Sequence, residues 1–256
     1  MPPHEKWITK FSLKGKTWVF IPNEESITFG SSLKEAIEDR WRVPHNYYHL
    51  KEGGHVAALR QHITNKLFLR LDIDNFFGQI NRSRITRNLK PLFPYEKARQ
   101  YAIESTVRDP DSREAKYILP FGFVQSPILA SICLRESALG RLLSSASKQE
   151  DVVCTVYMDD ILVSCNNLDT LRGIEEHLVA AASRSRLPLS QTKREGPGVS
   201  VTAFNVEISQ GDLHITKERM KEFINVFRQS SNENQRNGIL RYIESVNPIQ
   251  ARDLFN

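Results

Sequence analysis

Apolar residues in the first half of the chain alternate between short runs and helical spacings. Residues 7–30 have the pattern of short strands, including the apolar run 18–21 that Pro22 and Asn23 stop. The segment Ser32-Leu33-Lys34-Glu35 is a capping box, which predicts a helix from there toward Trp41. Further helices are predicted over residues 54–63 and 96–107, and a strand is predicted over residues 67–72.

The second half of the chain predicts a helix, a tight hairpin and a helical C-terminal segment. Ser126 followed by Pro127 predicts a helix start, with Ser at the N-cap and a buried apolar face over residues 129–143. Two apolar strands, 152–157 and 161–165, leave only Met158-Asp159-Asp160 between them, which predicts a tight hairpin. The remaining predicted elements are a helix ending near residue 187, a hairpin of residues 201–209 and 213–216, and helices over 217–229, 235–245 and after Pro248. This order predicts an α+β protein, with helices on one face of an antiparallel sheet.

The composition is that of an ordinary globular protein. The 256 residues are 40% hydrophobic and 25% charged, which excludes disordered, collagen-like and coiled-coil chains and allows one large domain or two closely packed lobes. Cys133, Cys154 and Cys165 lie in apolar runs without zinc-site spacing, so we expect buried thiols in a reducing compartment. The first residues lack the pattern of a secretory signal, and prolines interrupt the uncharged stretch 117–134. We therefore expect a cytoplasmic protein without a membrane partner.

The charge balance is basic but leaves two interpretations open. Thirty-five Lys and Arg against 30 Asp and Glu give a formal net charge of +5 and a pI near 9.1. A basic surface favours a polyanionic partner such as a nucleic acid, because Lys and Arg that neutralise phosphates release counterions. A plain soluble surface has the same balance, so charge alone does not decide.

Three carboxylates fall at the ends of predicted strands. Asp159 and Asp160 occupy the hairpin tip, and Asp72 ends the strand 67–72. Adjacent carboxylates repel each other, and a divalent cation between them removes that cost. Oxygens from a few Asp residues, completed by water and phosphates, suit Mg²⁺. The pattern therefore predicts two Mg²⁺ ions, with Mn²⁺ as the alternative, and two-metal attack of a 3′-hydroxyl on a nucleotide.

Three segments around these acids resemble the motifs of reverse transcriptases. Residues 71–80, Leu-Asp-Ile-Asp-Asn-Phe-Phe-Gly-Gln-Ile, resemble motif A, and residues 119–127, Leu-Pro-Phe-Gly-Phe-Val-Gln-Ser-Pro, resemble motif B. Residues 157–160 are the YMDD form of motif C, and residues 187–193 and 203–208 resemble motifs D and E more weakly. The resemblance implies a right-hand polymerase fold. Its expected parts are fingers at 1–66 with part of 81–118, a palm at 67–216 and a short helical thumb at 217–256.

The resemblance also implies catalytic and metal-binding roles. Asp72 and Asp159 would ligate both ions, with Asp160 in a weaker role beside them, and the carbonyl of Ile73 would reach the nucleotide-bound ion. Lys193 is the implied general acid for pyrophosphate, with a solvated lysine as the alternative.

The implied nucleotide site selects deoxynucleotides. Phe77 falls at the family's steric gate, where a ring leaves no room for a 2′-hydroxyl. Gly122 lets the backbone approach the nucleotide, and Phe121 stands where many relatives carry Gln. The full set of implied nucleotide-binding residues is Lys16, Arg40, Arg42, Asp74, Phe76, Phe77, Phe121, Gly122 and Gln125.

Contacts to the triphosphate, primer and template are also implied. Lys16 is expected at the triphosphate, with Arg40 and Arg42 as alternatives that Glu38 and Asp39 could instead neutralise. Free N–H groups at the Ser126-Pro127 helix start are expected near the template–nucleotide pair. The implied primer and template residues are Ser126, Pro127, Tyr157, Met158, Phe204 and Asn205.

Two segments refine the resemblance to a subgroup. Motif B in the form Pro-x-Gly-Phe-x-x-Ser-Pro, at 120–127, and residues 242–248 look most like bacterial stand-alone reverse transcriptases of the abortive-infection and phage-defence group. The implied function is RNA-directed DNA synthesis in phage defence. The implied partners are a structured non-coding RNA template, dNTPs, a DNA product, and a second copy or another protein.

Three alternatives remain open. One is untemplated or protein-primed DNA synthesis, and another is a retron enzyme that makes multicopy single-stranded DNA, although the retron signatures Asn-Ala-x-x-His and Val-Thr-Gly are absent from the sequence. The third is an idle palm that binds RNA as a structural subunit, which the presence of Asp72, Asp159 and Asp160 disfavours.

Overall fold

The computed structural model of the chain describes residues 5–13 and 17–255, which form two compact units. Unit 1 comprises Met1–His45, Ile73–Leu143 and Leu178–Pro188, and unit 2 comprises Asn46–Asp72, Ser144–His177 and Leu189–Asn256. Each unit is therefore built from three separate stretches of the chain.

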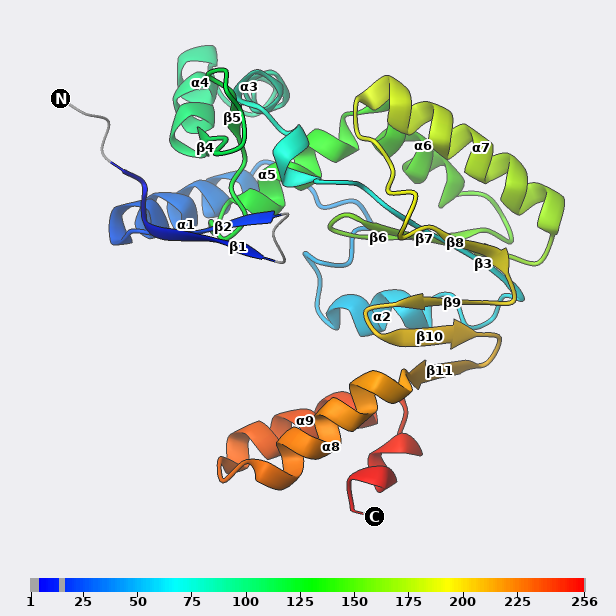
Figure 1. The fold of residues 1–256 in the computed structure, drawn as a ribbon. Coiled ribbons are helices and arrows are strands. Elements are labelled where there is room, and N and C mark those ends of the chain that lie inside the picture. Colours follow the sequence, from blue (N-terminus) through cyan, green and yellow to red (C-terminus); the bar gives the residue numbers. More distant parts are fainter. Residues whose placement is uncertain (1–4, 14–16, 256) are drawn as a thin grey trace. The chain divides into compact units, whose positions relative to one another are not determined.

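The centre of unit 2 is a four-stranded antiparallel sheet in the order β6-β7-β3-β8 (Figure 1). Its strands are β3 Leu67–Asp72, β6 Val153–Tyr157, β7 Asp160–Cys165 and β8 Glu195–Gly198. The aliphatic runs of β3 and β7 are buried on both faces, which explains why they are near-continuous rather than alternating. β3 pairs with β7 along its whole length, so the register places Asp72 opposite Asp160.

A second sheet and a helical segment complete unit 2 (Figure 1). The elements are α2 Gly54–Arg60, β9 Ser200–Ala203, β10 Val206–Ser209, β11 Asp212–Ile215, α8 Lys217–Gln229, α9 Glu233–Val246 and the 3₁₀ helix η2 Gln250–Leu254. Alternate residues of the three strands, such as Val206 and Ile208, pack into one core with Met220 and Phe227 of α8. The apolar spacing therefore predicted α8 correctly.

Unit 1 combines a hairpin, short helices and a small two-stranded sheet (Figure 1). Its elements are β1 Trp7–Leu13, β2 Thr17–Pro22, α1 Glu24–Glu38, the 3₁₀ helix η1 Phe77–Gln79, α3 Arg82–Leu89, α4 Tyr95–Glu104, β4 Val107–Arg108, β5 Tyr117–Ile118 and α5 Ser126–Arg135. Phe20 and Phe123 join Val107 and Ile118 in one of its hydrophobic clusters. Helices α6 Ala138–Ala146 and α7 Leu168–Ser185 supply residues to both units.

The first helix begins earlier than the capping box predicts. Asn23 is the N-cap, its side-chain oxygen accepts a hydrogen bond from the Ser26 N–H at 2.8 Å, and Glu24 and Glu25 occupy the first turn. Ser32 lies inside α1, so the predicted start there is wrong, as are predicted strands beyond Pro22. An Asn cap followed by acidic residues is the stronger start signal, because both satisfy or complement the exposed N–H groups.

The predicted helix after Ser126 is two helices. The N–H of Gly140 donates to the Ser137 hydroxyl at 3.0 Å, as at a helix start, and α5 ends at Arg135. A Cβ at Gly140 would lie 2.0 Å from the carbonyl oxygen of Leu134. The apolar positions on either side keep helical spacing, which hides the break from the pattern.

The predicted strand 201–209 is a hairpin of β9 and β10. Val206 pairs with Ala203, and the turn residues Phe204 and Asn205 have φ of +56° and +60°. Two such residues make the turn that fits the twist of a tight hairpin. Asn accepts this conformation readily and Phe does not, so no turn signal interrupts the pattern.

Other boundaries also move. α2 ends at Arg60, and α4 ends at Glu104, so that Val107 pairs with Ile118 in the β4–β5 sheet. The mostly polar helix α3 was not predicted, although Asn81 caps it through the Arg84 N–H at 2.9 Å. Among the described residues, no helix combines the length and apolar character that a membrane crossing requires. The boundaries of fingers, palm and thumb stay a prediction.

Candidate active site

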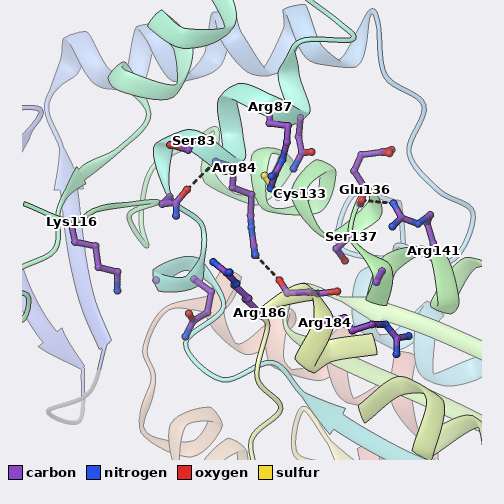
Figure 2. Close-up of a pocket in the computed structure, with 16 residues that line it drawn as sticks. Ser83, Arg84, Arg87, Lys116, Cys133, Glu136, Ser137, Arg141, Arg184 and Arg186 are labelled. Atoms are coloured by element: carbon purple, nitrogen blue, oxygen red, sulfur yellow. Dashed lines mark hydrogen bonds between the residues drawn. The ribbon is translucent and has the colours of Figure 1, made fainter. Parts of the chain in front are cut away.

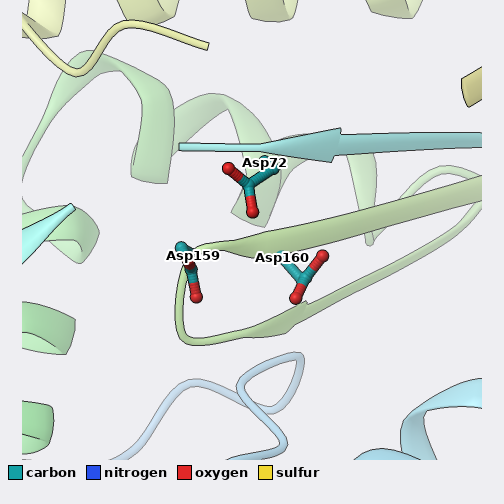
Figure 3. A group of neighbouring side chains, drawn as sticks. All are labelled: Asp72, Asp159 and Asp160. Carbon is teal, nitrogen blue, oxygen red and sulfur yellow. The ribbon is translucent and has the colours of Figure 1, made fainter. Parts of the chain in front are cut away.

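Unit 2 brings three carboxylates together where β3 ends and the β6–β7 hairpin turns. One oxygen each of Asp72, Asp159 and Asp160 lies within 4.8 Å of the others (Figure 3). Asp72 is buried and the other two are half-buried. We call these three residues the acid cluster. The predicted proximity of the three side chains is confirmed, while their catalytic role stays a prediction.

The hairpin tip is held in an unusual backbone conformation. Met158 has φ of +59°, which a side chain other than Gly rarely adopts. The Met158 N–H donates to Nδ1 of His49 at 3.1 Å, and burial lowers the pKa of His49 to about 4. His49 therefore stays neutral near pH 7 and keeps its acceptor nitrogen. Such local strain persists only where the surroundings fix it, and here it presents Asp159 at the tip.

Two basic residues partner the acid cluster. Nζ of Lys193 lies 2.8 Å from Oδ2 of Asp72, and the Arg70 guanidinium donates to Oδ1 of Asp160 at 2.8 and 3.0 Å. Arg70 also donates to the Thr202 carbonyl at 2.7 Å and lies 3.4 Å from Glu195. Within the described chain, Asp159 forms no salt bridge.

The pKa shifts show how burial and charge compete in the cluster. Burial and the neighbouring charges of Asp160 and Asp72 raise the pKa of Asp159 to about 6. Burial also raises the pKa of Asp72, although the ammonium of Lys193 opposes that shift. For Lys193, burial disfavours the charged form, but the hydrogen bond to Asp72 and the charges of Asp72, Asp159 and Asp160 together outweigh burial and raise the pKa. The cluster therefore gains from added positive charge.

A divalent cation fits this donor set. The three aspartates and Glu195 bring four negative charges, while Lys193 and Arg70 bring two positive ones. The remaining charge of these six side chains is −2, and the donors are hard oxygens of the kind that Mg²⁺, Mn²⁺ and Ca²⁺ take. The cluster could therefore hold a divalent metal ion. Ile73, the predicted carbonyl ligand, follows Asp72 directly and has a buried side chain.

Aromatic rings surround Tyr157, which ends β6 next to the turn of the hairpin. The Tyr157 ring lies 5.1 Å from the Phe204 ring and 5.9 Å from the His55 ring. His55 Nε2 and the Tyr242 hydroxyl are 3.1 Å apart, which ties α2 to α9. The predicted primer and template residues Tyr157 and Phe204 thus touch, although motifs C and E are far apart in sequence. Asn205, next to Phe204, is exposed.

In unit 1, residues predicted from motifs A and B also meet. The half-buried ring of Phe77 lies 5.6 Å from the Phe121 ring, edge to face, and Phe121 is 42% exposed. Phe76 is 4% exposed, so its ring offers almost no surface for the nucleotide contact predicted for it. Asp74 is exposed, and its N–H donates to the Pro188 carbonyl at 2.8 Å.

Gly122 has a packing role that the motif did not indicate. Its φ is +112°, and a Cβ would lie 2.3 Å from the carbonyl oxygen of Phe20. The Phe20 N–H donates to the Phe121 carbonyl at 2.9 Å, so β2 runs directly against motif B. Glycine is therefore required here by the close approach of two backbones.

The start of α5 does not have the free donors expected of it. Gln125, not Ser126, is the N-cap, and the Ser126 N–H donates to the Phe123 carbonyl at 3.1 Å. Pro127 has no N–H, so these two residues offer no free backbone N–H to a template. Gln125 and Ser126 are 0% and 1% exposed, which does not fit direct contacts with nucleotide or template.

Of the predicted triphosphate residues, the structure describes Arg40 and Arg42. Lys16 lies outside the described residues. Arg40 lies just beyond α1 and folds back on that helix, where it donates to the Ala36 carbonyl at 2.8 Å. It also lies 4.0 Å from Asp39 and covers the Phe93 ring at 5.2 Å. Arg42 is exposed.

Arg70 and His49 are site residues that the sequence analysis missed. Arg70 is the single charge inside an aliphatic strand and lies two residues before Asp72, hence on the same face of β3. That position was a usable signal. His49 lies 109 residues from its partner Met158, and no local pattern indicates it.

The fold resembles that of nucleic-acid polymerases. The structure of telomerase from Candida albicans, in complex with the TWJ fragment of telomeric RNA, aligns with 91% of this chain and 47% of that chain, with a TM-score of 0.52 and 9% identity. The structure of apo telomerase from Candida tropicalis aligns with 90% of this chain and 48% of that chain, with a TM-score of 0.49 and 11% identity. The structure of the foamy viral protease-reverse transcriptase in complex with double-stranded DNA aligns with 74% of this chain and 30% of that chain, with a TM-score of 0.47 and 18% identity. The chain thus spans less than half the length of these proteins. The first likeness confirms the predicted polymerase fold class.

The family follows from the sequence comparison. Residues 25–198, more than half of the chain, match the family model for reverse transcriptase (RNA-dependent DNA polymerase). The chain belongs to this family. The match includes all three residues of the acid cluster as well as Phe77 and Gly122.

Proposed function

We propose that this chain is an RNA-directed DNA polymerase that adds dNTPs to a 3′-hydroxyl. The observation that carries the proposal is the acid cluster, three carboxylates within 4.8 Å in a member of the reverse transcriptase family. Asp72 and Asp159 would hold two Mg²⁺ ions, with Asp160 beside them and Mn²⁺ as the alternative. Bound ions of this kind activate the attacking hydroxyl and stabilise the departing pyrophosphate.

The chain's own residues orient and balance the charges in this proposal. Arg70 fixes the carboxylate of Asp160 through two hydrogen bonds to one oxygen, which leaves the other oxygen for a different partner. Lys193 is 54% exposed in its side chain, so its ammonium can contact a substrate while it neutralises Asp72. A positive donor at that position would protonate or neutralise pyrophosphate as it leaves.

Removing the charge of Asp159 tests the proposal. Asp159→Asn keeps the side-chain shape but removes a negative ligand, so dNTP addition to a primer on an RNA template should fall by about three orders of magnitude or more. RNA binding, measured by fluorescence anisotropy, should persist. Asp169→Asn, at an exposed position in the first turn of α7, is the matched control and should extend primers like the wild type. Full primer extension by Asp159→Asn would refute the proposed active site.

Sugar selection tests the deoxynucleotide part of the proposal. Phe77 is half-buried, and its ring packs against the rings of Phe121 and Phe76. These contacts hold the ring in a fixed position, where it would block a 2′-hydroxyl. Phe77→Val removes most of the ring and should raise ribonucleotide incorporation relative to dNTP incorporation about tenfold or more, since exclusion by shape is the discriminating element. Primer extension with each nucleotide set measures the ratio. Equal use of NTPs and dNTPs by the wild type would instead indicate an RNA polymerase.

We further propose that the chain acts in the cytoplasm of a bacterium in phage defence, on a structured non-coding RNA. The support is the form of motif B at residues 120–127, and the free, buried thiols of Cys133, Cys154 and Cys165, which suit a reducing compartment. Sequencing the RNA and DNA that co-purify with the wild type and with Asp159→Asn tests this. The expected result is one enriched RNA in both samples and complementary DNA in the wild type only.

A further inference from the structure

Unit 1 contains a pocket of about 640 Å³ that none of the predicted site residues lines. Its walls come from α3, from the turn between α5 and α6, and from the C-terminal end of α7 (Figure 2). Pockets of this volume are typical of sites for small ligands. We call it the arginine pocket, after the side chains that line it.

The lining is strongly basic. It holds six basic side chains, Arg84, Arg87, Lys116, Arg141, Arg184 and Arg186. Glu136 is the one acidic residue among the described residues that line it, and Lys116 pairs with Asp109 at 3.0 Å. Across the part of the chain that the structure describes, none of the five arginines lies within 4.0 Å of a carboxylate. The positive charges of these arginines are therefore not neutralised by protein carboxylates. Their mutual repulsion destabilises the folded chain unless a bound anion neutralises them.

Arg84 is half-buried and has an unused donor. Its Nη2 donates to the Ser185 carbonyl at 2.5 Å, which anchors the guanidinium at the end of α7. Its Nη1 is buried and has no hydrogen-bond partner. A buried donor without an acceptor destabilises the fold. Burial lowers the pKa of Arg84, and Arg87 and Arg186 act in the same direction. An anion in the pocket would offset the repulsion among these guanidinium groups.

Arg186 occupies a position that normally takes glycine. The Leu187 N–H donates to the Ala182 carbonyl at 3.1 Å and the Arg186 N–H to the Ser183 carbonyl at 3.0 Å, which is the Schellman pattern at the end of α7. Arg186 has φ of +52°, the left-handed conformation that glycine adopts without strain. The chain thus accepts backbone strain at a residue whose side chain lines the pocket, and such strain is often found at binding sites.

We propose that the arginine pocket binds a ligand that carries two or more phosphate groups. Guanidinium groups match phosphate oxygens in charge and geometry, and the pocket is lined by five arginines that have no carboxylate partner among the described residues. Two sources have this chemistry, a free nucleoside polyphosphate and the backbone of an RNA segment. The proposal does not depend on polymerase activity, since no residue of the acid cluster lines the pocket.

Variants of the 256-residue chain test the proposal. In EDTA, which keeps divalent ions from the acid cluster, calorimetry measures binding of ATP and of inorganic tripolyphosphate, and anisotropy measures binding of a labelled single-stranded RNA. Arg184→Gln with Arg186→Gln should weaken binding of at least one probe by about 10-fold to 100-fold. The matched control, Arg113→Gln with Arg172→Gln, removes two exposed arginines outside the pocket and should change it less than about twofold.

Arg186→Gly separates binding from stability. Glycine removes the guanidinium and relieves the positive φ, so the variant should be as stable as the wild type or more so, yet bind the probe about tenfold more weakly. Loss of ATP and tripolyphosphate binding would identify a free nucleotide as the ligand, and loss of RNA binding alone would identify an RNA backbone. Unchanged affinity for all three probes in both pocket variants would overturn the proposal.

Discussion

The acid cluster of unit 2 and the arginine pocket of unit 1 concentrate opposite charges in different ways. Asp72 and Asp160 each have a basic partner within 2.8 Å, Lys193 and Arg70. The pocket arginines have no carboxylate within 4.0 Å among the described residues. In the acid cluster, Lys193 and Arg70 neutralise part of the negative charge, so the cluster contributes to the stability of the fold. In the arginine pocket, the protein supplies no carboxylate to the arginines, so a neutralising anion must come from solution.

The same contrast appears in how the two regions are connected to their cores. Arg70 donates to Asp160 and to the Thr202 carbonyl and so links the four-stranded sheet to β9. Arg184 and Arg186 are exposed and lie at the end of a helix. Removing the charge of Arg70 should therefore destabilise unit 2, whereas removing the charge of Arg184 should leave unit 1 folded. Measuring both variants tests the comparison directly.

The largest expected effect separates the two kinds of arginine. Arg70→Met leaves the half-buried carboxylate of Asp160 without its partner and should lower the free energy of unfolding by about 3 kcal/mol. Arg184→Met removes an exposed arginine without an acidic partner and should change it by about 0.5 kcal/mol or less. Urea denaturation at pH 7 measures both. Equal losses in the two variants would show that the comparison is wrong.

A second expected effect concerns the sheet that carries the acid cluster. His62 is fully buried and bridges the hydroxyls of Ser164 and Thr155 at 2.8 Å, and burial lowers its pKa to about 3. Between about pH 6.5 and pH 3 the unfolded chain binds a proton at this residue that the folded chain does not. Stability from this residue therefore falls by about 1.4 kcal/mol for each pH unit below 6.5, or about 2 kcal/mol at pH 5.

His62→Gln isolates this contribution from others of either sign. The pKa of Asp159, raised to about 6 by burial and by its acidic neighbours, has the opposite effect, because the folded chain then binds the extra proton. The variant should be less stable than the wild type at pH 7 but lose less stability between pH 7 and pH 5. Urea midpoints across that range measure the two slopes. Parallel slopes would show that His62 does not carry the pH dependence.

The smallest expected effect concerns the charge of the arginine pocket. A multivalent anion that binds only the folded chain should stabilise it by about 1.4 kcal/mol at ten times its dissociation constant. For a chain of this length, this stabilisation raises the melting temperature by about 3–5 °C. Thermal melts with added tripolyphosphate in EDTA measure the shift. Arg184→Gln with Arg186→Gln should abolish it and Arg113→Gln with Arg172→Gln should keep it; the same shift in all three proteins would place the anion elsewhere.

The sequence predicted best those elements whose own residues carry the pattern. β3, the β6–β7 hairpin and α8 follow from apolar runs and spacings, and the bounds of β3 and α8 match those predicted. The acid cluster was predictable because its residues lie at strand ends, and a strand that pairs in register with its neighbour brings those ends together. The apolar pattern missed the hairpin at Phe204-Asn205 because its strained turn contains no glycine, although the resemblance of residues 203–208 to motif E, a hairpin in that family, indicated it.

Tertiary structure alone decided which distant groups meet. Hydrophobic periodicity determines which face of an element is buried, but it does not determine which partner covers that face. Arg70 reaches Asp160, and Gly122 lies against the carbonyl of Phe20, only because separate stretches of backbone pack together. The arginine pocket combines residues from 78–88, 116, 133–141 and 184–186, and none of these segments forms a basic cluster large enough to be recognised by itself. The sequence by itself therefore determined the strands, the hairpin and the acid cluster. Long-range packing determined the partners of those acids and the charge of the pocket, because both depend on contacts between segments that carry no signal of one another.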